Sequence, residues 1–245
     1  MPTLPGASRP GAVPVLGVPG DGLVAPVPFE DLPEPLRGEL AARVERLGYL
    51  GGFFSVAAHQ PDPLLHFNRF TESLKDGLPG RLAEVVALAA AATAGNQYEL
   101  VQHIRLARKL GCPDTWIRAA AYGPDTPADG PTGRPADGPT EGPAQDPTGG
   151  PADGAGNGRV LYPALDPDEQ AVRALAVAAM SGHAARAELS AVVARLGQAT
   201  AVGVLLLLGR YVAHAMVARV LGLGPPVSLD PPLAPIRNAS PRRTP

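Results

Sequence analysis

Proline and glycine are concentrated in three segments of this 245-residue chain, and their placement limits where a packed fold can form. Residues 1–35, 120–159 and 224–245 hold 24 Pro and 16 Gly in 97 residues, whereas the other 148 residues hold 6 Pro and 13 Gly. Segments so rich in these two residues bury too little apolar surface to offset the entropy of ordering. The other 148 residues are enough for one sizeable core.

The middle segment is a repeat of eight residues, with Pro127, Pro135, Pro143 and Pro151 at equal spacing. This period is too short for a solenoid unit, and six acids with two arginines favour an extended, solvated linker. We therefore predict a single helical domain with one long insertion and two disordered tails. The expected ranges are a domain over 31–223, a low-complexity acidic linker over 122–159, and tails over 1–30 and 224–245.

The domain is predicted to be all-α, because apolar residues recur at helical spacing and no stretch alternates long enough for a convincing strand. Arg81–Ala94 is apolar on nearly every side, which is typical of a helix buried in a core or an interface. Asn96 and Glu99 fit a capping box at the start of the next helix. Gly197 is expected to separate the last two helices.

Composition excludes several classes of function. A formal charge of −2 without a basic block disfavours nucleic-acid binding. The single cysteine, Cys112, rules out an internal disulfide and a cysteine-rich zinc site, and no spacing indicates a metal or a phosphate loop. The apolar stretch Val202–Leu208 is too short for a membrane span, and the first residues lack a secretory pattern. We expect a cytoplasmic protein without membrane, metal or cofactor.

Three side chains are candidates for acid–base chemistry. Glu84 is the single charge between Leu82 and Ala94, and a buried carboxyl has a raised pKa that suits proton transfer. The alternative is that Glu84 merely complements the helix dipole. Glu99 and His103 lie four residues apart, so they share a helix face and can form a hydrogen bond. Capping by Glu99 and simple burial of His103 remain alternatives.

The stretches Pro79–Glu84 and Asn96–His103, followed by Ala107 and Gly111, resemble the carboxymuconolactone decarboxylase-like family, which shares its fold with the alkylhydroperoxidases. The resemblance covers about residues 31–121 and 160–223. It implies a bundle centred on a helical hairpin, assembled as a homotrimer or hexamer. The apolar helices Leu82–Ala94 and Thr200–Leu223 also favour self-association, because they offer much apolar surface.

In the peroxidase branch of that family, two cysteines lie between the glutamate and the histidine. Asn96 and Glu99 occupy those positions here, so that branch's thiol mechanism is missing, while a Tyr-Glu-x-x-x-His pattern similar to the decarboxylase-type branch is present. The family usually has an aromatic residue where Leu100 stands. The resemblance implies a cofactor-free lyase or isomerase acting on a small carboxylated or carbonyl substrate. Its catalytic residues would be Glu84, Glu99 and His103, with Tyr98, Asn96 and Tyr211 binding the substrate.

Two other functions remain open on the sequence. A non-catalytic member of the family would act as an oligomeric binding or scaffold protein, and its polar site would be collapsed or filled with apolar groups. A thiol peroxidase would have to use Cys112, which lies nine residues beyond His103, roughly 13 Å along a helix. Tyr211 and His214, three residues apart on the last helix, either line a pocket or pack in the core.

Overall fold

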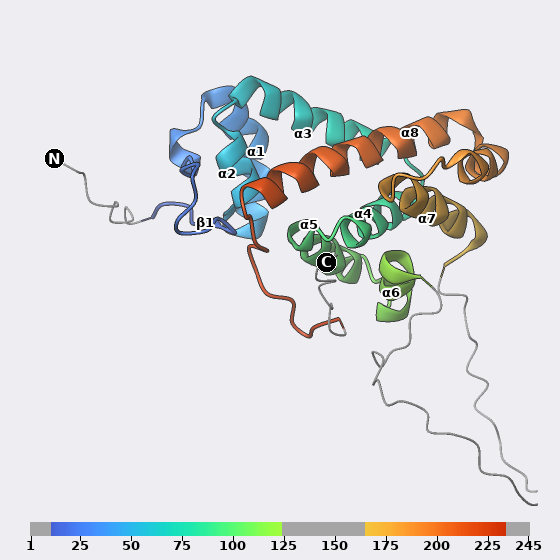
Figure 1. The fold of residues 1–245 in the computed structure, drawn as a ribbon. Coiled ribbons are helices and arrows are strands. Elements are labelled where there is room, and N and C mark those ends of the chain that lie inside the picture. The colour runs from blue at the N-terminus through green and yellow to red at the C-terminus, as the bar shows by residue number, and fades with distance from the viewer. Residues whose placement is uncertain (1–10, 124–164, 234–245) are drawn as a thin grey trace, which may run out of the picture.

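The computed structural model describes residues 11–123 and 165–233, and this part of the chain is mostly helical (Figure 1). The predicted all-α class is confirmed. Most of the predicted linker, and both ends of the chain, lie outside the described residues. The elements in order are β1 (Val15–Leu16), η1 (Phe29–Asp31), α1 (Glu34–Leu47), β2 (Leu50–Gly51), α2 (Gly52–Ala57), α3 (Pro61–Asp76), α4 (Leu82–Thr93), α5 (Gln97–Lys109), α6 (Asp114–Tyr122), α7 (Pro167–Met180) and α8 (Arg186–Val220).

Helix α4 is the centre of the domain. It packs against α5, α6, α7 and α8, and every side chain from Val85 to Ala90 is fully buried. This explains why its sequence is apolar on all sides, and it places α4 inside the fold rather than at an interface between copies. Gly95, with φ of 64°, turns the chain so that α5 returns antiparallel to α4 as the predicted hairpin.

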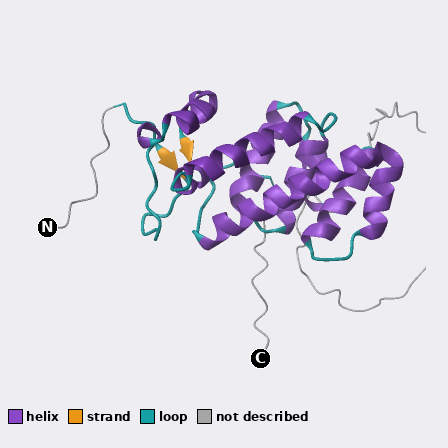
Figure 2. Ribbon diagram, turned by 90° about the horizontal axis from the view of Figure 1, so that it is seen from above, coloured by secondary structure: helices purple, strands orange, loops and turns teal. Residues whose placement is uncertain are grey.

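The N-terminal part of the domain begins earlier than the sequence predicted. Residues 15–16 pair in parallel with β2 in the register Val15↔Leu50, and the two strands lie at one end of the domain (Figure 2). The predicted disordered tail over 1–30 is therefore wrong for residues 11–30. The high proline and glycine content suggested disorder, but these residues form extended structure that packs on the domain. At Gly52, an added Cβ would lie 2.7 Å from Val18 Cγ2 and 3.0 Å from the backbone carbonyl of Gly17, so glycine is required there.

The predicted C-terminal tail needs the same correction over residues 224–233. The amide of Gly224 donates a hydrogen bond to the carbonyl oxygen of Gly17 at 3.1 Å, and Leu233 is buried in the core around α4. These contacts anchor both extended segments to the helical body.

Helix caps explain how the chain restarts after the insertion. Asp166 accepts hydrogen bonds from the amides of Asp168 and Glu169, and the Glu169 carboxylate accepts one from the amide of Asp166. This is a full capping box.

At the start of α5 only half of the predicted capping box exists. The Asn96 side chain accepts the Glu99 amide at 3.3 Å, while the backbone amide of Asn96 donates to the Ala91 carbonyl oxygen. The Glu99 carboxylate therefore does not bind the Asn96 amide and can contact other side chains.

Helix α8 crosses the domain between α3 and α4 (Figure 1). Its helical geometry is interrupted at Gly197, as the sequence predicted. By length and composition, α8 is the one helix of the described part that is long and apolar enough to cross a membrane, and 28% of its most apolar window is buried. Its inner face holds Arg210, Tyr211 and His214 in the protein interior. Its outer face exposes large apolar side chains: Val202, Leu205, Leu206, Val212, Met216 and Val220.

Candidate active site

A cavity of about 390 Å³ lies among α1, α3, α5 and α8, and it holds the predicted acid–base residues. Glu84 comes from α4, Glu99 and His103 come from α5, and all three side chains are buried and line this cavity. Tyr98, predicted to bind substrate, also lines it. The remaining lining residues are Arg43, Arg46, Leu47, Tyr49, Gly51, Phe54, Glu72, Lys75, Asp76, Gln102, Arg105, Leu106, Lys109, Arg210 and His214.

The α4–α5 hairpin brings Glu84 and His103 into direct contact. His103 Nδ1 donates a hydrogen bond to Glu84 Oε2 at 2.8 Å. Within the described part of the chain, the other carboxylate oxygen, Glu84 Oε1, makes no hydrogen bond or ion pair. One oxygen of Glu84 therefore fixes the imidazole, and the other is available to a molecule in the cavity.

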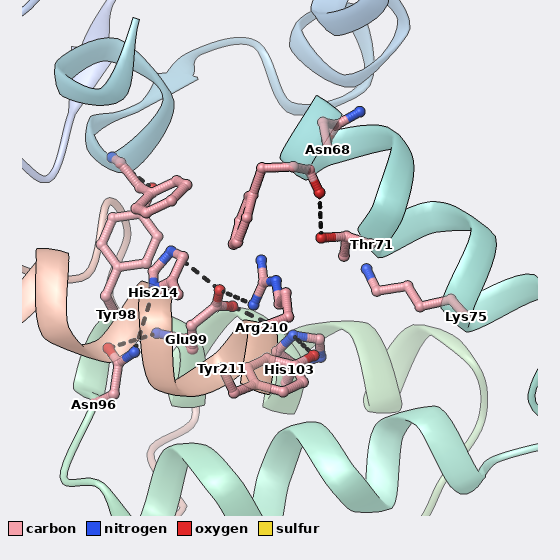
Figure 3. Close-up of polar contacts among 12 residues, drawn as sticks. Asn68, Thr71, Lys75, Asn96, Tyr98, Glu99, His103, Arg210, Tyr211 and His214 are labelled. Carbon is pink, nitrogen blue, oxygen red and sulfur yellow. Dashed lines mark hydrogen bonds and ion pairs between the residues drawn. The ribbon is translucent and has the colours of Figure 1, made fainter. Parts of the chain in front are cut away.

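Glu99 differs from Glu84 because both of its oxygens are occupied (Figure 3). Oε1 accepts a hydrogen bond from Arg210 at 2.6 Å and lies 3.1 Å from His214 Nε2, while Oε2 lies 3.3 Å from His103 Nε2. Glu99 therefore ties α5 to α8 and leaves no carboxylate oxygen unpaired.

The tautomer of His214 follows from its neighbours. Asn96 uses its side-chain oxygen to accept the Glu99 amide, so its amide nitrogen donates to His214 Nδ1 at 3.2 Å. His214 Nε2 consequently carries the hydrogen and donates it to Glu99. The imidazole also stacks on Phe53, with ring centroids 4.0 Å apart.

Tyr211 and Asn96, which we expected to bind substrate, do not line the cavity. Tyr211 is only 1% exposed, and its hydroxyl lies 3.0 Å from His103 Nε2. Asn96 is also outside the lining, because its side chain joins α5 to His214. Both residues hold the histidines in position. Tyr98 stays at the cavity wall, where its hydroxyl accepts the Phe53 amide at 3.4 Å.

Comparison with known proteins agrees with this arrangement. Residues 61–137 match the Carboxymuconolactone decarboxylase family. Over this part of its sequence the chain is similar to that family. Its fold is similar to the alkylhydroperoxidase AhpD core of an uncharacterized peroxidase-related protein from Ralstonia eutropha JMP134, with a TM-score of 0.58 and 17% sequence identity over 82% of this chain and 91% of that chain. Among curated proteins, none matches the sequence.

The charge of His103 in this site is set by the two carboxylates around its ring. Burial lowers the pKa of His103, but Glu84 and Glu99 outweigh burial and raise it to about 9. Burial likewise raises the pKa of Glu84, and His103 reverses this, so the net pKa is lowered. At neutral pH the pair is an imidazolium and a carboxylate. The cationic ring donates from Nδ1 to Glu84 and from Nε2 toward Glu99 and Tyr211.

Glu99 and His214 form the fixed part of the same network. Burial raises the pKa of Glu99, but Arg210, His214 and His103 together hold it well below its usual range. Burial lowers the pKa of His214 to about 4, so this ring is neutral. His103 and His214 thus differ in charge although they contact the same carboxylate.

Arg210 is the functional residue that the sequence reasoning missed. It is buried, it binds Glu99, and its guanidinium lies 4.6 Å from the centre of the Tyr211 ring. The signal was available, because Arg210 is the single charge between Leu196 and Ala218 on an apolar helix. The same criterion had singled out Glu84.

The single cysteine, Cys112, does not line the cavity. Cys112 is buried in the core around α4. Burial raises the pKa of its thiol despite the nearby Arg81. Within residues 11–123 and 165–233, no group of three or more His, Cys, Asp or Glu is arranged to hold a metal ion.

Proposed function

We propose that the chain is a cofactor-free enzyme of the lyase or isomerase type, which exchanges a proton with a small carboxylated substrate. The observation that carries the proposal is the asymmetry of Glu84, which lines the cavity: Oε2 is bound to the His103 imidazolium, and Oε1 has no hydrogen-bond partner among the residues that the structure describes. A buried carboxylate with one free oxygen and an acidic partner is equipped for general acid–base catalysis.

The charges around the cavity favour an anionic substrate. Six Arg or Lys side chains and the His103 imidazolium face four carboxylates, leaving an excess of positive charge. Positive potential in a cleft concentrates anions and orients their carboxylates. The cationic residues are Arg43, Arg46, Lys75, Arg105, Lys109 and Arg210, and the acidic ones are Glu72, Asp76, Glu84 and Glu99.

Each residue of the site has a distinct part in the proposed reaction. Loss of carbon dioxide leaves an electron pair on carbon, and that carbon must take up a proton. In this proposal Glu84 Oε1 takes up a proton from water and delivers it to that carbon, while the His103 imidazolium stabilises the returning carboxylate through the 2.8 Å contact with Oε2. Isomerisation of a lactone uses the same atoms, with Glu84 first taking and then returning a proton.

Glu99 acts as a positioning residue in this proposal rather than as an acid or base. Its two oxygens are fully engaged by Arg210, His214 and His103. It raises the proton affinity of His103 and holds the ring against Tyr211.

The two alternatives receive less support. A non-catalytic scaffold would have no reason to keep two buried carboxylates, an arginine and a cationic histidine around an open cavity, since burying charge costs several kcal/mol per ion. A thiol peroxidase has the support of the peroxidase-related protein that shares the fold. It would have to use Cys112, a thiol outside the cavity with a raised pKa.

The test is turnover of Glu84→Gln on a panel of lactones and β-keto acids, measured by carbon dioxide release and by solvent deuterium incorporation. We expect a fall of about 10²–10⁴-fold, as for loss of a general acid–base group. The matched control is Glu45→Gln, since Glu45 is exposed on α1 and lies outside the cavity lining. Equal turnover by the two variants would remove Glu84 from the mechanism. Peroxide consumption that ends with Cys112→Ser would favour the peroxidase instead.

A further inference from the structure

Lysine is rare in this chain, and both lysines line the same cavity. The sequence holds 19 arginines and two lysines, Lys75 and Lys109. Every other Lys-or-Arg position is an arginine, which stays protonated in proteins, whereas a lysine amine can lose its proton and become a nucleophile. The use of lysine at this cavity therefore points to amine chemistry rather than to charge alone.

Among residues 11–123 and 165–233, no group forms a hydrogen bond with the amine of Lys75. An ion pair joins Lys75 Nζ to Glu72 Oε1 at 3.7 Å, and that oxygen already accepts a hydrogen bond from Arg43 at 2.8 Å. The Lys75 side chain is 26% exposed. Figure 3 shows it reaching from α3 toward Arg210, into the space above Glu99 and His103.

The surroundings of Lys75 also favour its neutral form. Burial lowers the pKa of the amine, Glu72 opposes this, and the cations Arg210 and Arg43 lower it again, so the net pKa is below the usual value. A lysine amine that is desolvated beside other cations is the recognised way to activate it as a nucleophile. Lys109, at the last residue of α5, is exposed and serves as an internal reference.

We propose that Lys75 forms an imine with the ketone of a β-keto acid bound in this cavity. This inference deepens the proposed function and rests on it for the later proton transfer. Nζ attacks the carbonyl carbon, and a carbon–nitrogen bond forms. The carbonyl oxygen leaves as water, taking one proton from Nζ and one from solvent, which leaves a cationic iminium.

The iminium then accepts the electrons released by decarboxylation. The bond between the α-carbon and the carboxylate breaks, carbon dioxide departs, and the electron pair forms a carbon–carbon double bond while the nitrogen becomes neutral. Glu84 Oε1 delivers a proton taken up from water to the α-carbon, which regenerates an iminium. Water hydrolyses it, releasing the ketone and restoring the amine of Lys75. No oxidant or reductant is needed.

Trapping tests the imine without requiring turnover. The full-length protein is incubated with acetoacetate, reduced with borohydride and analysed by intact mass and peptide mapping. We expect one reduced adduct on Lys75, unchanged in Lys109→Arg and lowered about tenfold or more in Lys75→Arg, since arginine cannot form it. Helical content by circular dichroism verifies that both variants fold. Absence of an adduct on Lys75, or equal labelling of Lys109, would overturn the inference.

The outcomes separate this inference from the proposed function. If Glu84→Gln still yields the adduct on Lys75 but no longer sustains multiple turnovers of the β-keto acid, both stand. If a folded Lys75→Arg variant decarboxylates acetoacetate as fast as the native protein, the imine is wrong and proton transfer by Glu84 stands. If Lys75 is trapped but Glu84→Gln turns over normally, the imine stands and the proposed role of Glu84 fails.

Discussion

His103 donates to Glu84 across 2.8 Å between two helices, and the carboxylate oxygen that is not used in this contact has no hydrogen-bond partner in the part of the chain that the structure describes. Glu99, on the same helix as His103, has no such freedom, because Arg210 and His214 hold one of its oxygens and His103 the other. Two buried carboxylates around one imidazole thus have different tasks: one is free to react, and the other fixes the geometry.

The two buried histidines predict that stability is greatest near pH 6.5. The pKa of His103 is raised to about 9 on folding, so its contribution is complete below pH 6.5 and is lost as pH rises through 9. The pKa of His214 is lowered to about 4, so its contribution is present above pH 6.5 and is lost as pH falls toward 4. Each of these pKa shifts corresponds to a contribution of roughly 3 kcal/mol to the free energy of unfolding.

Urea unfolding between pH 5 and pH 9 measures this profile. His103→Gln should flatten the alkaline limb and His214→Gln the acidic limb above pH 5, because each removes one titrating group. A free energy of unfolding that rises steadily from pH 6.5 to pH 9 would contradict the assignment of His103 as the cation.

Replacing Arg210 by methionine should destabilise the fold strongly. The change removes the 2.6 Å partner of a buried carboxylate and leaves Glu99 with uncompensated charge, which typically costs 3–5 kcal/mol. Combining Arg210→Met with Glu99→Gln should recover part of that loss, since the buried charge is then absent. The free energies of unfolding of the Arg210→Met variant and of the double variant, measured in urea, show whether stability is recovered. Additive effects of the two changes would show that the pair is not coupled.

Gly51→Ala should disturb the cavity wall. A Cβ at this position would overlap the hydroxyl of Tyr98, which accepts the Phe53 amide, so Tyr98 must move. Overpacking of this kind typically costs 1–3 kcal/mol. The control is Gly38→Ala on the exposed side of α1, where no atom lies within 4 Å and alanine should add up to about 1 kcal/mol. Equal melting temperatures for the two variants would contradict the contact.

Self-association through the outer face of α8 is our expectation for the exposed apolar side chains of that helix. Val202, Leu206 and Met216 recur at helical spacing on one side, and α4, also considered as an interface, is buried within the fold. Leu206→Glu combined with Met216→Glu should dissociate the oligomer in light scattering, because charge cannot be buried unpaired. Ala41→Glu, on the exposed side of α1, is the control. A monomeric native protein would end this proposal.

Local sequence patterns were sufficient for the helices and for half of the site. Helical spacing placed α4 and α5, and the lone charge in α4 together with the four-residue spacing of Glu99 and His103 identified three neighbours correctly. The hairpin that joins them is short, so few arrangements are open to it. Asn96 and Tyr211 contact the two histidines and do not line the cavity, which spacing could not predict because it does not show whether a side chain faces a cavity or another side chain.

Local sequence patterns could not predict which residues of α8 contribute to the site. Arg210 and His214 meet Glu99 across 111 and 115 residues, and only the packing of α8 along α4 and α3 sets that contact. High proline and glycine content predicted disordered tails over residues 11–30 and 224–233. Such a composition is still compatible with extended structure, and here Val15, Val18 and Leu233 pack that structure against the domain.

The titration of His103 followed by NMR of histidine-labelled protein tests the central claim most directly, since it needs no substrate. The account predicts a pKa of about 9 for His103 in the native protein and a clearly lower value in Glu84→Gln, because that change removes the carboxylate charge beside Nδ1. A pKa near 6.5 that is the same in both proteins would contradict the Glu84–His103 proton pair.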